Sequence, residues 1–118
     1  MGKLTTHVLD STHGSPAAGV RINLYSVGLG EVFDLIGEYA TNDDGRCDRP
    51  LLDGDAFTPG VYEMRFHIGE FFAKTNLNIP DTPFLDVVPI RFGISAPDEH
   101  YHVPLLVSPY AYSTYRGS

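Results

Sequence analysis

Cysteine and basic side chains are scarce in the 118-residue sequence, and both shortages limit what the protein can be. A single cysteine, Cys47, excludes an internal disulfide framework and is typical of a reducing compartment. Eight Lys and Arg residues stand against 15 Asp and Glu residues, which gives a formal net charge of −7. Because nucleic acid repels a surface this acidic, we expect no nucleic-acid partner.

Long apolar runs and targeting signals are also lacking. The longest apolar stretch, residues 103–107, is far shorter than the roughly 20 residues needed to span a bilayer. No basic-then-apolar leader precedes Leu4, so we expect a cytoplasmic protein with no secretory signal and no membrane partner. Neither a Gly-x-Ser-x-Gly elbow nor a complete dinucleotide fingerprint occurs, which argues against both of those classes of site.

Period-two alternation of apolar and polar residues dominates what is present, and it predicts short strands separated by turns. The expected strands cover residues 4–9, 20–25, 35–41, 60–68 and 87–94, with two more joined around Ser108-Pro109. Only residues 69–76 favour a helix, of about two turns. We therefore predict a mainly β protein with a single domain, residues 1–118, folded as an antiparallel β-sandwich.

Two histidines near the carboxyl terminus have a spacing that is compatible with metal binding. His100 and His102 are two positions apart, so they share one face of an expected strand. This spacing can chelate zinc if His7 supplies a third ligand through folding, and a zinc-binding scaffold is one alternative function. Polar decoration of a strand is the simpler interpretation of each histidine taken alone.

The terminal residues 115–118 combine a phenol, a guanidinium and a hydroxyl. They end a stretch, residues 100–118, that is rich in aromatic and β-branched residues. We therefore expect this chain end to be held in a sheet, which would make it part of a site. Tyr115 and Arg116 point to opposite faces of a regular strand, and Gly117 supplies the freedom for both to reach one ligand. A solubilising edge strand is the alternative.

Arg46 follows residues 42–45, a strong turn signal that ends in Asp-Gly. An arginine tethered by a turn can be directed at a carbonyl or carboxylate with fixed geometry. Alternatively, it pairs with Asp43 or Asp44. Arg46 also adjoins Cys47 and could lower the pKa of that thiol, but a catalytic cysteine needs a positioned histidine as well. An ordinary side chain near a turn is therefore the simpler interpretation of Cys47.

Together, four parts of the chain resemble the 5-hydroxyisourate hydrolases, the transthyretin-related enzymes of urate degradation. They are LTTHVLD (4–10) with PAAG (16–19), TNDDGR (41–46) with PLL (50–52), YHVPLL (101–106) and YRGS (115–118). The terminal tetrapeptide looks like the feature that separates the hydrolases from transthyretin, the hormone carrier on the same fold. A transthyretin-like carrier of a small aromatic ligand is the second alternative function.

The resemblance implies a transthyretin-like sandwich of about eight strands with one short helix. It also implies a homotetramer, built as a dimer of dimers with active sites in the channel where the dimers meet. The implied reaction opens the six-membered ring of 5-hydroxyisourate by water attack on a ring amide carbonyl, giving 2-oxo-4-hydroxy-4-carboxy-5-ureidoimidazoline. No cofactor or metal is expected.

The same resemblance assigns roles to residues. His7 and His102 would share proton handling, since a histidine with a pKa of about 6.5 can act as a base near neutral pH. Arg46 would hold the polarised substrate oxygens with its fork of donors. The terminal side chains would close the site and bind the ring: Tyr115, Arg116 and Ser118. The serine counts among the catalytic set as a binder rather than a nucleophile, because no activating triad accompanies it.

Overall fold

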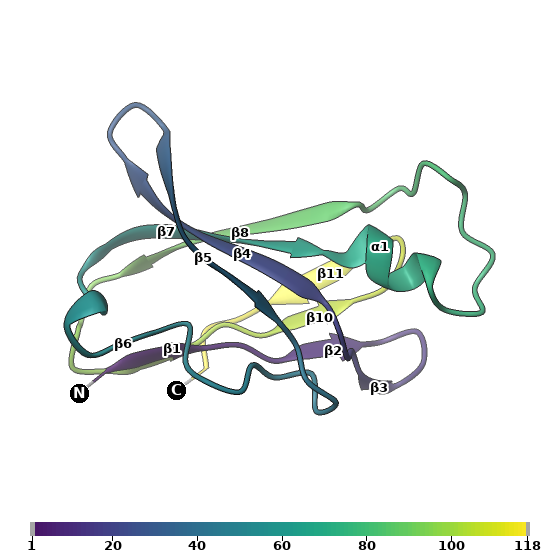
Figure 1. Cartoon of the computed structure of the whole chain (residues 1–118), viewed down its shortest axis with the longest axis horizontal. Helices are drawn as coiled ribbons and strands as arrows, with labels where there is room; N and C mark the ends of the chain where they lie inside the picture. Colours follow the sequence, from purple (N-terminus) through teal and green to yellow (C-terminus); the bar gives the residue numbers. More distant parts are fainter. Residues whose placement is uncertain (1, 118) are drawn as a thin grey trace.

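Alternating apolar and polar residues build two packed β-layers in the computed structural model, which describes residues 2–117 (Figure 1). The strands are β1 (Lys3–Thr5), β2 (Val8–Asp10), β3 (Ser15–Pro16), β4 (Arg21–Gly28), β5 (Val32–Ala40), β6 (Leu52–Asp53), β7 (Gly60–His67), β8 (Val87–Ile94), β9 (His100–His102), β10 (Leu105–Val107) and β11 (Tyr112–Thr114). One layer is the antiparallel sheet β5-β4-β7-β8, and the other combines the sheets β6-β1-β9 and β11-β10-β2-β3. The predicted mainly β sandwich is confirmed.

The core lies between the layers and is filled by the alternate residues of each strand. On β4, Ile22 and Leu24 are fully buried, and on β7 Met64 and Phe66 are fully buried beside them. Complete burial of an apolar side chain of this size contributes about 1.5–3 kcal/mol to folding. The alternation in residues 20–25 and 60–68 therefore predicted the inward face of the larger sheet correctly.

The expected first strand, residues 4–9, is divided in two. β1 and β2 both pair in parallel with the carboxyl-terminal segment, as Thr5 with His102 and as Val8 with Leu105. The offset along the chain is the same in both pairs, so one register continues across the break. At the break the Thr6 hydroxyl donates to the Val103 carbonyl at 2.7 Å, replacing a backbone donor of the ladder.

Two details refine the predicted sandwich. Not all pairings are antiparallel, because β1 pairs with β9 and β2 with β10 in parallel. The described residues form eleven strand segments rather than about eight. The excess arises because β1 with β2, and β9 with β10, are broken strands, and because β3 is only two residues long.

The helix and one strand lie close to where they were expected. Helix α1 (Ile68–Ala73) begins one residue before the predicted 69–76 and ends three residues earlier. A 3-10 turn, Gly54–Ala56, follows β6. Strand β5 begins at Val32 rather than residue 35, because it forms a hairpin with β4 that extends beyond the sandwich (Figure 1). Within residues 2–117, no helix is long and apolar enough to cross a membrane.

The turn at residues 42–45 packs tightly against β2. The Val8 N–H donates to the Gly45 carbonyl at 2.8 Å, and Gly45 has a φ of 77°. A Cβ at this position would lie 2.4 Å from the Val8 carbonyl oxygen. The turn therefore requires glycine both for its backbone angle and for space.

Replacement of Gly45 by Ala is expected to destabilise the fold more than the same change at Gly14. Both glycines have positive φ, 77° and 68°, so each replacement carries the left-handed cost of about 1–2 kcal/mol. Only Gly45 adds a clash, because nothing lies within 4 Å of a Cβ at Gly14. Urea denaturation at equal protomer concentration should give Gly45→Ala the lower midpoint, and equal midpoints would contradict this packing.

Candidate active site

Strand β9 turns its two histidines away from the core. Tyr101, between them, is buried, and its hydroxyl accepts the N–H groups of Ser95 at 3.1 Å and Ala96 at 3.0 Å. Strand alternation then places His100 and His102 together on the opposite face, where both are half-buried. The prediction that they share a face is confirmed.

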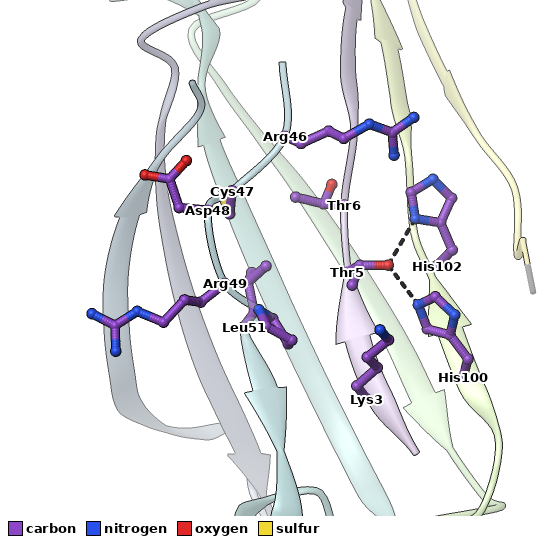
Figure 2. A pocket seen from close by; sticks show the side chains of 11 residues that line it. Lys3, Thr5, Thr6, Arg46, Cys47, Asp48, Arg49, Leu51, His100 and His102 are labelled. Atoms are coloured by element: carbon purple, nitrogen blue, oxygen red, sulfur yellow. Dashed lines mark hydrogen bonds between the residues drawn. The ribbon is translucent and has the colours of Figure 1, made fainter. Parts of the chain in front are cut away.

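Strand β1 brings a hydroxyl between the two imidazoles. The parallel register sets Lys3 against His100 and Thr5 against His102. The Thr5 Oγ1 atom lies 2.8 Å from His100 Nε2 and 2.9 Å from His102 Nδ1, so one hydroxyl contacts both rings (Figure 2).

The chain end is tied to His102 through its backbone. The Gly117 N–H donates to the His102 carbonyl at 2.7 Å, and the His102 N–H donates to the Gly117 carbonyl at 3.3 Å. A Cβ on Gly117 would lie 3.0 Å from His102 Cδ2, so a larger residue would press on the imidazole. Ser118, expected in the site, lies outside the described residues.

Arg46 enters the site from the turn at residues 42–45. The Asn42 side-chain oxygen accepts the N–H groups of Asp44 at 2.9 Å and Arg46 at 3.2 Å, which fixes the start of the arginine segment. The Arg46 side chain then extends toward His102 (Figure 2). Within residues 2–117, Arg46 makes no ion pair with Asp43 or Asp44, so that alternative is wrong.

His7 lies next to Arg46, with which it forms an isolated antiparallel bridge. Its Nε2 lies 2.8 Å from the Asp44 carbonyl oxygen. A carbonyl only accepts, so Nε2 donates, and neutral His7 carries its proton on that nitrogen. His7 is not among the residues that line the cavity described next.

A cavity of about 370 Å³ opens between β1, β9 and the segment that follows the turn (Figure 2). This volume lies within the range of about 300–1,000 Å³ that is typical of small-molecule sites. Its lining residues are Lys3, Thr5, Thr6, Arg46, Cys47, Asp48, Arg49, Pro50, Leu51, His100 and His102. Two imidazoles and two arginines thus border one cavity, and Arg46 and His102, both predicted site residues, are among them.

Electrostatics keep both imidazoles uncharged. Burial lowers the pKa of His102, and so does the positive charge of Arg46, to which His100 and His7 add whenever they are protonated. Burial and then the Lys3 ammonium lower the pKa of His100 in the same way. A neutral imidazole is the form that accepts a proton, so both rings are available as bases near pH 7.

Cys47 is an ordinary, unactivated side chain, as the simpler interpretation of the sequence has it. Burial, and then the negative charge of Asp48, raise the pKa of its thiol to about 11, so Arg46 does not activate it. The thiol is protonated at neutral pH and lines the cavity as a small neutral group.

The side chains of Tyr115 and Arg116 do not line this cavity within one chain. The Arg116 guanidinium donates to Glu99 at 2.9 Å and lies 4.1 Å from the Tyr101 ring centroid. Tyr115 is 60% exposed. Both residues line a second cavity, of about 290 Å³, between β8 and the segment after β11.

The zinc alternative lacks ligands. Within the described part of the chain, no group of three or more His, Cys, Asp or Glu side chains is arranged to hold a metal ion. His7 is bonded to the Asp44 carbonyl and does not join His100 and His102.

Thr5 and Lys3, which β1 sets against the two histidines, were not predicted as site residues from the sequence. The available signal was the alternation in residues 4–8, where Leu4, Thr6 and Val8 are buried and the residues between them face outward. Thr5 and His7 therefore belong to one outward face.

The fold and cavity together define a transthyretin-like β-sandwich. Its polar, histidine-lined site lies on the layer that contains β1 and β9. The profile of the HIUase/Transthyretin family matches residues 4–117, and the chain belongs to this family. The predicted family resemblance is confirmed.

Comparison with individual proteins is more specific than the family match. A 5-hydroxyisourate hydrolase of Pseudomonas aeruginosa is 55% identical over 118 residues, covering 100% of this chain and 93% of that protein. The structure of an (S)-allantoin synthase is 53% identical with a TM-score of 0.93, and this chain spans 99% of its own length but 44% of that chain. Sea bream transthyretin in complex with thyroxine is 26% identical with a TM-score of 0.85, covering 98% and 94% of the two chains.

His102 is expected to titrate below the ordinary histidine value of 6.5, and Arg46→Ala should raise its pKa. The direction follows because removing a nearby positive charge makes the imidazolium less unfavourable. Histidine ring NMR shifts followed against pH measure both midpoints. Arg21→Ala, on the other sheet, is the matched control and should leave the midpoint where it is. A midpoint that does not rise in Arg46→Ala would contradict the described electrostatics.

Proposed function

We propose that this protein is a hydrolase that opens the six-membered ring of 5-hydroxyisourate, with residues 1–118 acting as one domain. The observation that carries the proposal is the cavity in which a neutral His102 imidazole and the Arg46 guanidinium meet. The 55% identical relative that bears this activity in its name supports the choice of substrate. The product would be 2-oxo-4-hydroxy-4-carboxy-5-ureidoimidazoline.

His102 would act as the general base. A water molecule between the imidazole and the ring amide carbonyl would lose its proton to the ring nitrogen of His102 as its oxygen attacks. The lowered pKa of His102 favours this role, because the ring is already unprotonated near neutral pH. Placing base, water and carbonyl in one cavity removes much of the entropic cost of bringing them together.

Arg46 would stabilise the charge that develops on the carbonyl oxygen. Its guanidinium presents several N–H donors in a fixed plane, and the turn at residues 42–45 limits the motion of its backbone. Such preorganised donors act most strongly where water is partly excluded. His7, beside Arg46, would bind the substrate from the same side and share proton handling.

Ring opening would then return the proton. The tetrahedral intermediate collapses with cleavage of the ring C–N bond, and protonated His102 gives its proton to the departing nitrogen. No thiolate takes part, since the Cys47 thiol is protonated at this pH. His102 thus accepts a proton and then donates one, and ends the cycle in its starting form.

A homotetramer, built as a dimer of dimers, would complete the site. Strands β8 and β11 are the last strands of their sheets, and the second cavity lies between them, so a second copy could extend both sheets there. Tyr115, Arg116 and Ser118 would then close the substrate sites at interfaces between subunits. A cytoplasmic location is part of the proposal and is supported by the single cysteine.

The carrier alternative rests on the transthyretin likeness alone. The named hydrolase is 55% identical, whereas the transthyretin of sea bream is 26% identical. A carrier would bind an aromatic ligand without accelerating any reaction, so a turnover assay separates the two functions.

His102→Ala and Arg46→Ala should each lower turnover of freshly generated 5-hydroxyisourate by about 10²-fold or more. Because this substrate also decays spontaneously, the measurement is the acceleration of its absorbance loss over an enzyme-free control. His13→Ala and Arg21→Ala are the controls. They remove a histidine and an arginine that do not line the cavity, so they should retain activity. Sedimentation equilibrium should show one species of four chains for all variants. Near-normal turnover in His102→Ala or Arg46→Ala would refute the assignment.

A further inference from the structure

We propose that Thr5 and His100 act as positioning residues that fix the tautomer of His102, so that its Nε2 atom faces the substrate without a proton. This inference rests on the proposed function, because it explains how the base of that reaction is held ready. Thr5 touches neither the expected water nor the carbonyl. Its effect would pass through the imidazole that it contacts.

The hydroxyl of Thr5 couples the two rings. It lies within hydrogen-bonding distance of a nitrogen on each, 2.8 Å from His100 Nε2 and 2.9 Å from His102 Nδ1. Both imidazoles are neutral near pH 7, for the electrostatic reasons given above. A hydroxyl has one proton to donate, so it donates to one ring and accepts from the other.

Two arrangements satisfy these bonds. In the first, Thr5 donates to His100 Nε2 and accepts from His102 Nδ1–H, which leaves His102 Nε2 with a lone pair. In the second, both bonds are reversed, and His102 Nε2 carries the proton. Only the first arrangement gives a base at the second nitrogen of His102.

Arg46 selects the first arrangement. Figure 2 shows the second nitrogen of the His102 ring turned away from Thr5, on the side where the Arg46 guanidinium lies. The positive charge of Arg46 acts on His102 strongly enough to lower its pKa. A lone pair toward a cation is favourable, whereas an N–H group toward it is not.

The backbone holds this geometry in place. Thr5 and His102 are paired in the parallel register of β1 and β9, and Gly117 closes against the other side of His102. His100 is needed as the acceptor for the Thr5 proton. Without it, the hydroxyl would be free to donate to His102 Nδ1 and stabilise the unproductive tautomer.

The test compares hydroxyl removal with hydroxyl retention at position 5. Thr5→Val keeps the shape and removes the hydroxyl, and it should lower kcat by about 10²-fold, the scale of a general base, with little change in KM. Thr5→Ser keeps the hydroxyl and should stay within about threefold of wild type. Thr12→Val, in an exposed loop, is the matched control. Normal kcat in Thr5→Val would overturn the proposal.

His100 gives a second, independent arm. His100→Gln retains an acceptor oxygen near the position of Nε2 and should keep most of the activity, whereas His100→Ala should lose about as much as Thr5→Val. Equal losses in His100→Gln and His100→Ala would overturn a positioning role, because the imidazole itself would then be required.

A spectroscopic measurement separates this inference from the proposed function. Long-range ¹H–¹⁵N NMR spectra of histidine rings at pH 7 should show His102 protonated at Nδ1 in the wild type and in Thr5→Ser. In Thr5→Val the proton should shift toward Nε2. An inactive wild-type protein would refute the hydrolase alone, while an unprotonated Nδ1 in the wild type would refute the tautomer assignment alone.

Discussion

The parallel pairing of β1 with β9 is the constraint on which the site depends. Its register places Thr5 beside His102 and Lys3 beside His100, so a hydroxyl and an ammonium approach two imidazoles from the neighbouring strand. Tyr101 holds β9 to the core from the opposite face. A slip of one residue would turn both histidines inward, where burial of unpartnered imidazoles would oppose folding.

Positively charged side chains near the two histidines affect their pKa values. Arg46 and Lys3 border the cavity, and together with burial they hold the pKa values of His102 and His100 below the ordinary value. A chain of net charge −7 thus places Lys3, Arg46 and Arg49 around one cavity, where the proposed reaction would develop negative charge on a carbonyl oxygen. The same burial raises the pKa of Cys47 and keeps the thiol out of the chemistry.

Local pattern predicted the parts of this structure that depend on local physics. Alternation identified the buried face of β7, the common face of His100 and His102, and the turn that directs Arg46. The hydrogen bonds that Thr5 shares with the two histidines could not be predicted from the sequence. They join residues more than ninety positions apart, through a register that no short pattern encodes. The direction of the Cys47 pKa shift could not be read from the adjacent arginine, because burial raises the pKa and the negative charge of Asp48 raises it further.

The central claim is that backbone pairing at the chain end holds His102 where ring opening needs it. Turnover of 5-hydroxyisourate by Gly117→Ala tests this most directly, because the added Cβ would lie 3.0 Å from His102 Cδ2. Gly28→Ala is the control, since a Cβ there meets only ordinary contacts at 3.6 Å and beyond. The account predicts that Gly117→Ala loses about tenfold or more in kcat, with the urea midpoint and the assembly unchanged. Wild-type turnover in Gly117→Ala would contradict it.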